Sequence, residues 1–190
     1  ILNRNIGFYL DIGCYHETLY SNTKLLSLIG WKGIGVDANP DLKSEWVFRR
    51  PNDKFYNVCI GSSEVDNSAL EFFRFQDGAM STADPERAQF LINQGWKLKD
   101  SIKVQSISLT HLAYQIKQQI AERVDFVTID LEMINFLADL PDFLNLLKPQ
   151  LLCMECVNVD ITLETLYLSD EYDNLKSASY EPNCIYRRQI

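Results

Sequence analysis

The chain has 190 residues, a formal net charge of −8 and 46% hydrophobic residues. This length suffices for one domain with a sizeable core, and the composition is that of a globular protein. The acidic balance argues against a nucleic-acid partner, which would need a basic face, and we interpret the adjacent pairs Arg49–Arg50 and Arg187–Arg188 as solvated surface. No apolar run approaches the roughly 20 residues of a membrane-spanning helix.

The sequence has no internal repeat, low-complexity segment or linker, so we expect a single domain over residues 1–190. It opens at Ile1 rather than at Met, without a signal-peptide pattern, which leaves room for an upstream segment. The five cysteines are an odd number and most have apolar neighbours. This usage predicts reduced, mostly buried thiols and a cytoplasmic protein.

Buried-looking strands alternate with amphipathic helices along the chain. In chain order, we expect a strand at 7–13, a helix at 21–30, a strand at 32–37, a helix from Asn39–Pro40 to before Pro51, and strands at 55–60 and 70–75. There follow a helix from Asp84–Pro85 to near Gly95, a strand at 104–109, a helix capped by Thr110, a strand at 124–130, a helix ending near Lys148–Pro149, a strand at 151–157, a loop or hairpin turn around 173–183 and a last strand at 184–188.

This alternation predicts an α/β fold with a mostly parallel central sheet and helices on both faces. In such a fold a ligand binds at the carboxyl ends of the strands, where the strand order reverses. Four of the five expected strand ends carry acids, namely Asp11, Asp37, Asp130 with Glu132, and Glu155. Each acid alone could cap a helix or pair with an arginine. As a set, they indicate a ligand with hydroxyls, an amine or a positive charge.

The Cys153–Cys156 pair forms a C-x-x-C inside the apolar run LLCMECV. Successive strand residues point to opposite faces, so thiols three positions apart cannot easily bind one ion. The chain has no second such pair and only two histidines, and we therefore predict no metal site.

Asp37 ends the second expected strand, about 24 residues after Gly13. An acid at this place accepts hydrogen bonds from ribose hydroxyls, which fits either a dinucleotide or S-adenosylmethionine. A pyrophosphate needs further glycines for close backbone approach, but the residues after Gly13 are Cys-Tyr-His-Glu. S-adenosylmethionine has no phosphate, and its methionine end can be held by Asp11 and by polar donors. Those donors are Ser21, Asn22 and Thr23.

Three stretches, DIGCYHETLYSNT, GWKGIGVDANP and FVTIDLE, together resemble the FkbM family of S-adenosylmethionine-dependent methyltransferases. That family has a strand ending in Asp-x-Gly, a Ser-Asn-Thr, a Gly-Trp-x-Gly, an acid before Asn-Pro and, further on, an Ile-Asp-x-Glu-Gly-x-Glu. The likeness extends over about residues 6–188.

The resemblance implies a Rossmann-like class I methyltransferase fold with an antiparallel C-terminal strand. It implies methyl transfer from S-adenosylmethionine to a hydroxyl on a sugar, glycan, lipid or secondary metabolite, with Asp130 and Glu132 beside the sulfonium and the acceptor. The cofactor residues that it implies are Asp11 and Gly13 for the methionine end, Asp37 for the ribose, and Asn57 to Ser62 for the adenine.

Two positions depart from the family pattern. The glycine of Glu-Gly-x-Glu is Met133 here, and the second acid is Asn135. These changes open an alternative, a degenerate member that binds S-adenosylmethionine or a partner without turnover.

A hydroxyl acceptor also needs a base to remove its proton. His16 is the first candidate, because it follows Gly13 by three residues and a histidine titrates near neutral pH. His16 could instead order its loop by hydrogen bonding. Glu132 and Glu155 are the other candidate bases, and two carboxylates such as Asp130 and Glu132 do not specify a metal.

Overall fold

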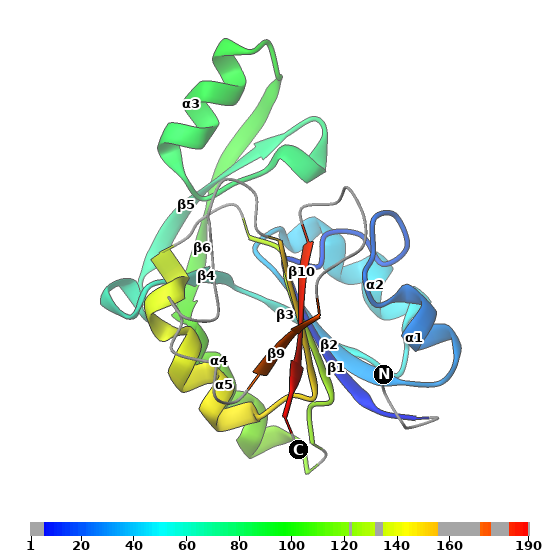
Figure 1. Ribbon diagram of the computed structural model, residues 1–190. Helices are drawn as coiled ribbons and strands as arrows, with labels where there is room; N and C mark the ends of the chain where they lie inside the picture. The colour runs from blue at the N-terminus through cyan, green and yellow to red at the C-terminus, as the bar shows by residue number, and fades with distance from the viewer. Residues whose placement is uncertain (1–5, 122, 132–134, 156–171, 176–182, 190) are drawn as a thin grey trace.

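The computed structural model describes residues 6–121, 123–131, 135–155, 172–175 and 183–189. These residues form an α/β fold in which a seven-stranded sheet carries helices on both faces (Figure 1). A three-stranded sheet lies beside it. No helix in the described part of the chain is long and apolar enough to cross a membrane.

The seven-stranded sheet has the order β3-β2-β1-β7-β8-β10-β9. All its pairs are parallel except the two made by β10, which runs antiparallel to both neighbours. The order reverses at β1, because β2 and β3 lie on one side of it and β7 and β8 on the other. The strands are β1 (Phe8–Ile12), β2 (Lys32–Asp37), β3 (Lys54–Asn57), β7 (Phe126–Ile129), β8 (Leu151–Glu155), β9 (Tyr172–Leu175) and β10 (Asn183–Arg188).

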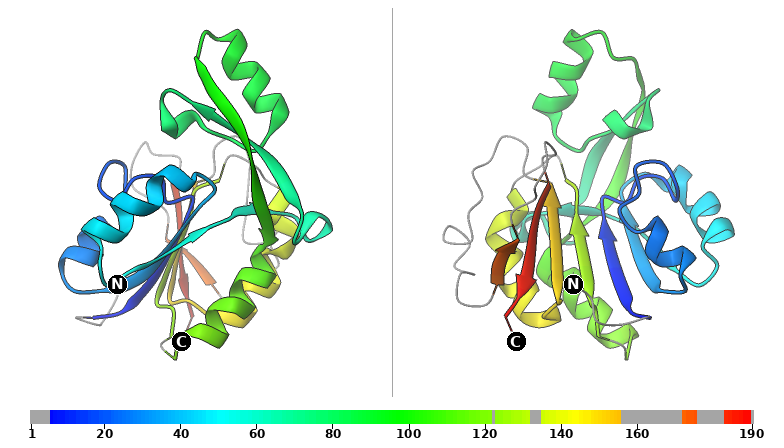
Figure 2. Two further views of the ribbon diagram at one scale, coloured as in Figure 1. Left: turned by 180° about the vertical axis from the view of Figure 1, so that it is seen from behind. Right: turned by 45° about the vertical axis from the view of Figure 1, so that its right-hand side comes forward.

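The two faces of this sheet are covered by different helices. α4 (Leu109–Gln119) and α5 (Leu140–Leu147) cover one face and share the largest apolar core with the sheet. α1 (Lys24–Leu28) and α2 (Lys43–Arg49) lie on the other face (Figures 1 and 2). There, the fully buried Trp46 packs with Phe55 and Cys14.

The smaller sheet is an insertion between β3 and α4. It consists of β4 (Cys59–Gly61), β5 (Ala69–Phe75) and the long β6 (Leu98–Ser108), which runs parallel to β4 and antiparallel to β5. The insertion also contains α3 (Pro85–Asn93) and rises away from the main sheet (Figure 2). Short 3-10 turns complete the fold at η1 (Pro40–Leu42), η2 (Ser63–Val65), η3 (Gly78–Met80) and η4 (Asn135–Asp139).

Most expected elements are confirmed, but several boundaries are wrong for physical reasons. The expected strand at 55–60 is two strands, because the chain leaves the main sheet at Val58 and enters the smaller one. The strand expected at 104–109 begins at Leu98, where its mostly exposed residues pair with β5 alone. Ser108 rather than Thr110 caps α4, since its Oγ accepts the His111 N–H at 3.1 Å.

The last part of the chain shows a further difference. Tyr172–Leu175 forms strand β9, part of which was expected as a loop or hairpin turn. The final expected strand is confirmed as β10, whereas the end of the strand expected at 151–157 lies partly outside the described residues.

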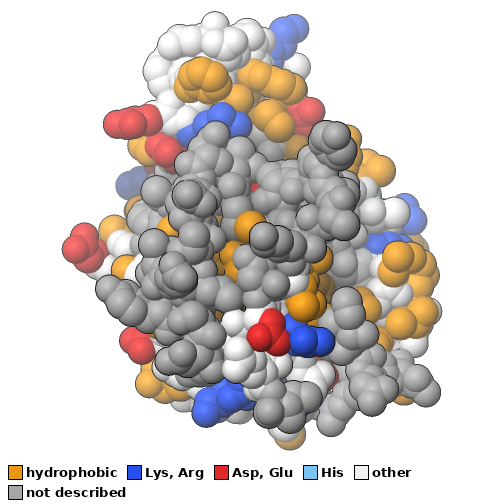
Figure 3. All heavy atoms as spheres, viewed as in Figure 1, with side chains coloured by type: hydrophobic (Ala, Val, Ile, Leu, Met, Phe, Trp, Pro, Cys, Tyr) orange, Lys and Arg blue, Asp and Glu red, His pale blue; other side chains and the backbone are white. Residues whose placement is uncertain are grey.

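Helix α1 is much shorter than the expected span of 21–30 and has no buried residue. Its Leu25 and Leu28 are 77% and 67% exposed, and Phe48 on α2 is 78% exposed. Figure 3 shows exposed hydrophobic side chains over this pair of helices, on the right, and over α3, at the top.

Candidate functional site

A cavity of about 430 Å³ lies where the strand order of the main sheet reverses. Its walls come from the carboxyl ends of β1, β2, β7 and β8, from β4, and from the segment 77–83 of the insertion. This volume is in the range of pockets that enclose small ligands. The position is where an open α/β sheet binds its ligand.

Gly13 forms the turn at the end of β1 and brings two strand ends together. Its φ is +75°, and its N–H donates to the Val36 carbonyl at 2.9 Å. A Cβ on Gly13 would lie 1.8 Å from the carbonyl oxygen of Asp130. Only glycine therefore fits at this turn, because both the backbone conformation and the contact exclude a side chain.

Asp37 ends β2 and binds the loop that follows β1. Its Oδ2 accepts the Tyr15 N–H at 2.9 Å, and its Oδ1 accepts the Asn39 N–H at 2.8 Å. Burial raises the pKa of this carboxyl to about 6, although the two backbone hydrogen bonds lower it. Each carboxylate oxygen can accept a second hydrogen bond, so Asp37 can still receive hydroxyls from a ligand in the cavity.

Asp11 lies in the same wall, near the end of the central strand β1. Because side chains alternate along a strand, Leu10 and Ile12 enter the core under α4 and α5, whereas Asp11 faces the opposite way. Asp11 is 3% exposed and accepts a hydrogen bond from the Thr23 hydroxyl. Burial raises its pKa to about 6, while the Thr23 bond and the Arg50 charge act to lower it.

The cavity wall is acidic and contains no basic side chain among the residues that the structure describes there. Such a wall repels phosphate groups and favours a cation or a neutral hydroxyl-bearing ligand. The rest of the wall includes apolar side chains from β2, β4 and β5, among them Val36, Ile60 and Phe72. Its carboxyl groups are those of Asp11, Asp37, Asp77, Asp130 and Glu155.

The structure brings six of the residues selected from the sequence into this wall, namely Asp11, Gly13, Asn22, Asp37, Asp130 and Glu155. Ser21 and Thr23, which were also selected, lie behind the cavity wall. The Ser21 hydroxyl accepts from Arg50 at 2.6 Å, and Thr23 is fully buried between Arg50 and Asp11. Ser21 and Thr23 therefore support the wall rather than line it.

Of residues 57–62, which were expected near the adenine, only the middle part lines the cavity. Val58, Cys59 and Ile60 line the cavity, whereas Asn57 and Ser62 at the two ends of this range do not. The Asn57 amide instead donates to the carbonyl oxygens of Asp37 and Ala38, both at 2.9 Å.

His16 is not among the residues of the cavity wall. Its Nδ1 accepts the backbone N–H groups of Thr18 and Leu19 at 3.0 and 3.1 Å, which orders the loop after β1. Its assignment as a base stays a prediction. Glu132 and Met133 lie outside the described residues, as does the side chain of Asn135.

Sequence reasoning missed two contributors to the site. Arg50 is 1% exposed, so its interpretation as solvated surface was wrong, and an arginine beside an arginine gives no signal of burial. The turn-forming pair Asp77–Gly78 is a signal that could have drawn attention to the segment 77–83. In this segment, Gly78 packs under the ring of Tyr15, whose Cε2 would lie 3.1 Å from a Cβ at that position.

Within the described residues, no group of three or more potential metal ligands comes together. Cys153 is a free thiol in β8, and Cys156 lies outside the described residues.

No protein-family model and no curated protein matches this chain. The FkbM resemblance therefore rests on the sequence motifs alone, and the activity that it implies is a proposal.

Proposed function

We propose that the chain is an S-adenosylmethionine-dependent methyltransferase with a class I methyltransferase fold. The mostly parallel sheet, whose order reverses at β1, agrees with that fold. So does β10, because the FkbM resemblance implies a last strand that runs antiparallel to the others.

The observation that carries the proposal is the charge of the cavity wall at the reversal point. Five carboxyl groups and no described basic group line it. A dinucleotide would bring an anionic pyrophosphate to this wall, and Gly13 is the only glycine in the loop from β1 to α1 that could let it approach. S-adenosylmethionine instead brings a cationic sulfonium and an ammonium group, and both are attracted by carboxylates.

The wall offers partners for each part of this cofactor. Asp37 at the end of β2 is suited to the two ribose hydroxyls, and the apolar strip 58–60 is suited to the adenine. Asp11 and the amide of Asn22, near the turn at Gly13, are suited to the ammonium and carboxylate of the methionine end.

When bound, S-adenosylmethionine supplies an electrophilic methyl group to an oxygen of the acceptor. The residues of the chain must hold that oxygen in line, exclude water and take its proton. Asp130 follows β7 in the cavity wall, and we assign it a place beside the acceptor. The acidic wall favours a neutral or cationic acceptor, such as a hydroxyl of a sugar, glycan, lipid or secondary metabolite, over an anionic one.

A thermal-shift panel separates the candidate ligand classes. We expect S-adenosylmethionine and S-adenosylhomocysteine to raise the melting temperature and NAD to leave it unchanged, because ligands that bind only the native state stabilise it. A shift with NAD alone would support a dinucleotide enzyme instead. If S-adenosylmethionine raises the melting temperature but no hydroxyl-bearing acceptor is methylated, the degenerate alternative is favoured.

A further inference from the structure

Arg50 is a buried cation next to the candidate site that the proposed chemistry does not use. It follows α2, is 1% exposed, and its guanidinium lies 4.2 Å from the centroid of the Trp46 ring. A buried arginine is costly unless its donors are satisfied. Its nearest carboxylate contact, Asp53 Oδ2, is 3.9 Å from Nη1, which is beyond hydrogen-bonding distance.

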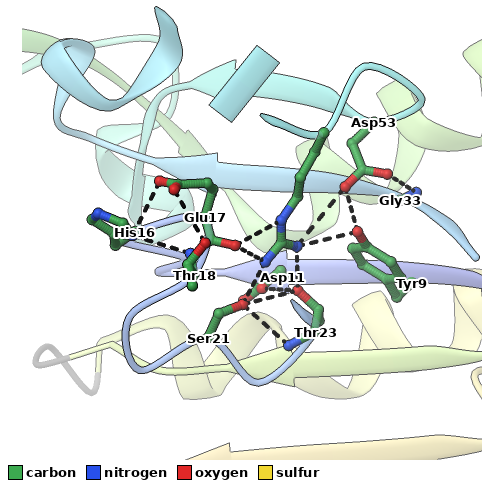
Figure 4. A network of polar contacts seen from close by, with 10 residues as sticks. Tyr9, Asp11, His16, Glu17, Thr18, Ser21, Thr23, Gly33 and Asp53 are labelled. Atoms are coloured by element: carbon green, nitrogen blue, oxygen red, sulfur yellow. Dashed lines mark hydrogen bonds and ion pairs between the residues drawn. The ribbon is translucent and has the colours of Figure 1, made fainter. Parts of the chain in front are cut away.

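All five N–H groups of Arg50 have acceptors in the structure. Figure 4 labels the four acceptor residues, Tyr9, Glu17, Ser21 and Thr23. Nε and Nη2 both donate to the backbone carbonyl of Glu17, and Nη2 also donates to the Ser21 hydroxyl at 2.6 Å. Nη1 donates to the Thr23 hydroxyl at 2.8 Å and to the Tyr9 hydroxyl at 3.2 Å. Three of these four acceptor residues belong to the loop between β1 and α1.

The Thr23 hydroxyl connects Arg50 to a second residue. Its oxygen accepts from Arg50, and its single proton is donated to Oδ2 of Asp11, because an ionised carboxylate can only accept a hydrogen bond. Asp11 lines the cavity, so this two-step contact connects a buried cation to the wall of the candidate site.

We propose that Arg50 is a positioning residue of the candidate site and acts on Asp11 through Thr23. By binding Glu17 and Ser21, the same guanidinium also holds the loop whose two ends line the cavity, at 13–15 and at Tyr20 and Asn22. The effect on ligand binding rests on the function proposed above, whereas the effect on Asp11 does not.

The charges around Asp11 explain why its ionisation depends on this contact. Burial raises the pKa of Asp11, and the carboxylates of Asp37 and Asp53 raise it further. The Thr23 hydrogen bond and the charge of Arg50 are the influences that lower it. The nearby Cys14 thiol is buried and its own pKa is raised, so it adds no charge near neutral pH. Loss of Arg50 therefore leaves Asp11 protonated at a higher pH.

The test follows the titration of the Asp11 carboxyl carbon by NMR in the ligand-free protein. Arg50→Met and Thr23→Val should each shift the midpoint of the Asp11 titration to higher pH. Thr23→Ser keeps the hydroxyl and should leave this midpoint at its wild-type value. Arg49→Met is the matched control, because Arg49 is the exposed neighbour whose ion pairs are made with Glu17 and Glu45. If Arg50→Met does not fold, Thr23→Val decides, since it removes a single hydroxyl.

A second measurement follows the affinity for S-adenosylmethionine against pH in the same proteins. Each unit by which the Asp11 midpoint rises above the assay pH should weaken binding about tenfold, with recovery toward pH 9. An Asp11 midpoint equal in the wild type, Arg50→Met and Thr23→Val overturns the inference, whatever the ligand. Absence of binding to the wild type overturns the proposed function, while the titration still decides the role of Arg50.

Discussion

Replacing Gly13 by alanine tests the close approach of the two strand ends under the candidate site. The new Cβ would meet the Asp130 carbonyl oxygen at 1.8 Å, and the residue would keep a φ of +75°. The positive φ costs about 1–2 kcal/mol for a residue with a side chain. Forcing an extra carbon into a packed region costs a further 1–3 kcal/mol or so. The variant should therefore lose roughly 2–5 kcal/mol of unfolding free energy.

Gly30→Ala is the matched control, because Gly30 has a φ of +95° and a Cβ added there would have no atom within 4 Å. It should lose only the conformational part, about 1–2 kcal/mol. For a chain of this size, each kcal/mol lowers the melting temperature by about 2–4 °C, so thermal and urea unfolding can separate the two variants. Equal losses in Gly13→Ala and Gly30→Ala would refute the contact between the ends of β1 and β7.

Three further predictions concern charge and burial. The pKa of Asp11 in the folded protein, about 6, lies above its ordinary 3.8, so native protein binds this proton more tightly and stability falls as pH rises from about 4 to 6. The melting temperature of Asp11→Asn minus that of the wild type should therefore increase as the pH rises from 4.5 to 7.5. A melting-temperature difference that stays constant over this range would contradict the prediction. Arg74→Met removes the two 2.6 Å bonds to Asp100 and the 2.8 Å bond to Asp41. Because both carboxylates are exposed to solvent, the urea-unfolding midpoint should stay close to that of the wild type, and a loss as large as that of Gly13→Ala would disagree. Burial raises the pKa of Cys59 and Cys153 to about 11, so both thiols should stay protonated and unreactive in the folded protein. Mass spectrometry should find both unmodified by iodoacetamide at pH 8 until urea is added. Rapid alkylation of the native protein would show instead that these thiols are accessible.

The central sheet could be predicted from the sequence because its strands are continuous apolar runs. Strands buried on both faces carry this signal, and β1, β2, β7 and β8 were all expected close to their observed positions. Because these strands are parallel, their carboxyl ends lie at the same edge of the sheet. Asp11, Asp37 and Asp130 were therefore expected to lie near one another, and they do so in the cavity wall.

The remaining features depend on contacts between distant segments. Helix α1 begins at Lys24 rather than Ser21, because the side chains of Ser21 and Thr23 accept hydrogen bonds from Arg50, which is 27 or more residues away in sequence. The break at Val58 between β3 and β4 has no glycine or proline to mark it. No local pattern could have predicted either feature.

Calorimetric titration with S-adenosylmethionine tests the central proposal most directly, using the wild type, Asp37→Asn and Asp142→Asn. Asp142→Asn is the matched control, because it makes the same aspartate-to-asparagine change at an exposed residue. Asp142 lies in the first turn of α5, on the opposite face of the sheet from Arg50. Since a buried site loses much of its affinity when a charged partner of a hydroxyl is removed, Asp37→Asn should bind at least about tenfold more weakly. Asp142→Asn should bind like the wild type. Binding of equal strength in all three proteins would contradict the assignment of Asp37 to the ribose, and no binding by the wild type would contradict the proposed function.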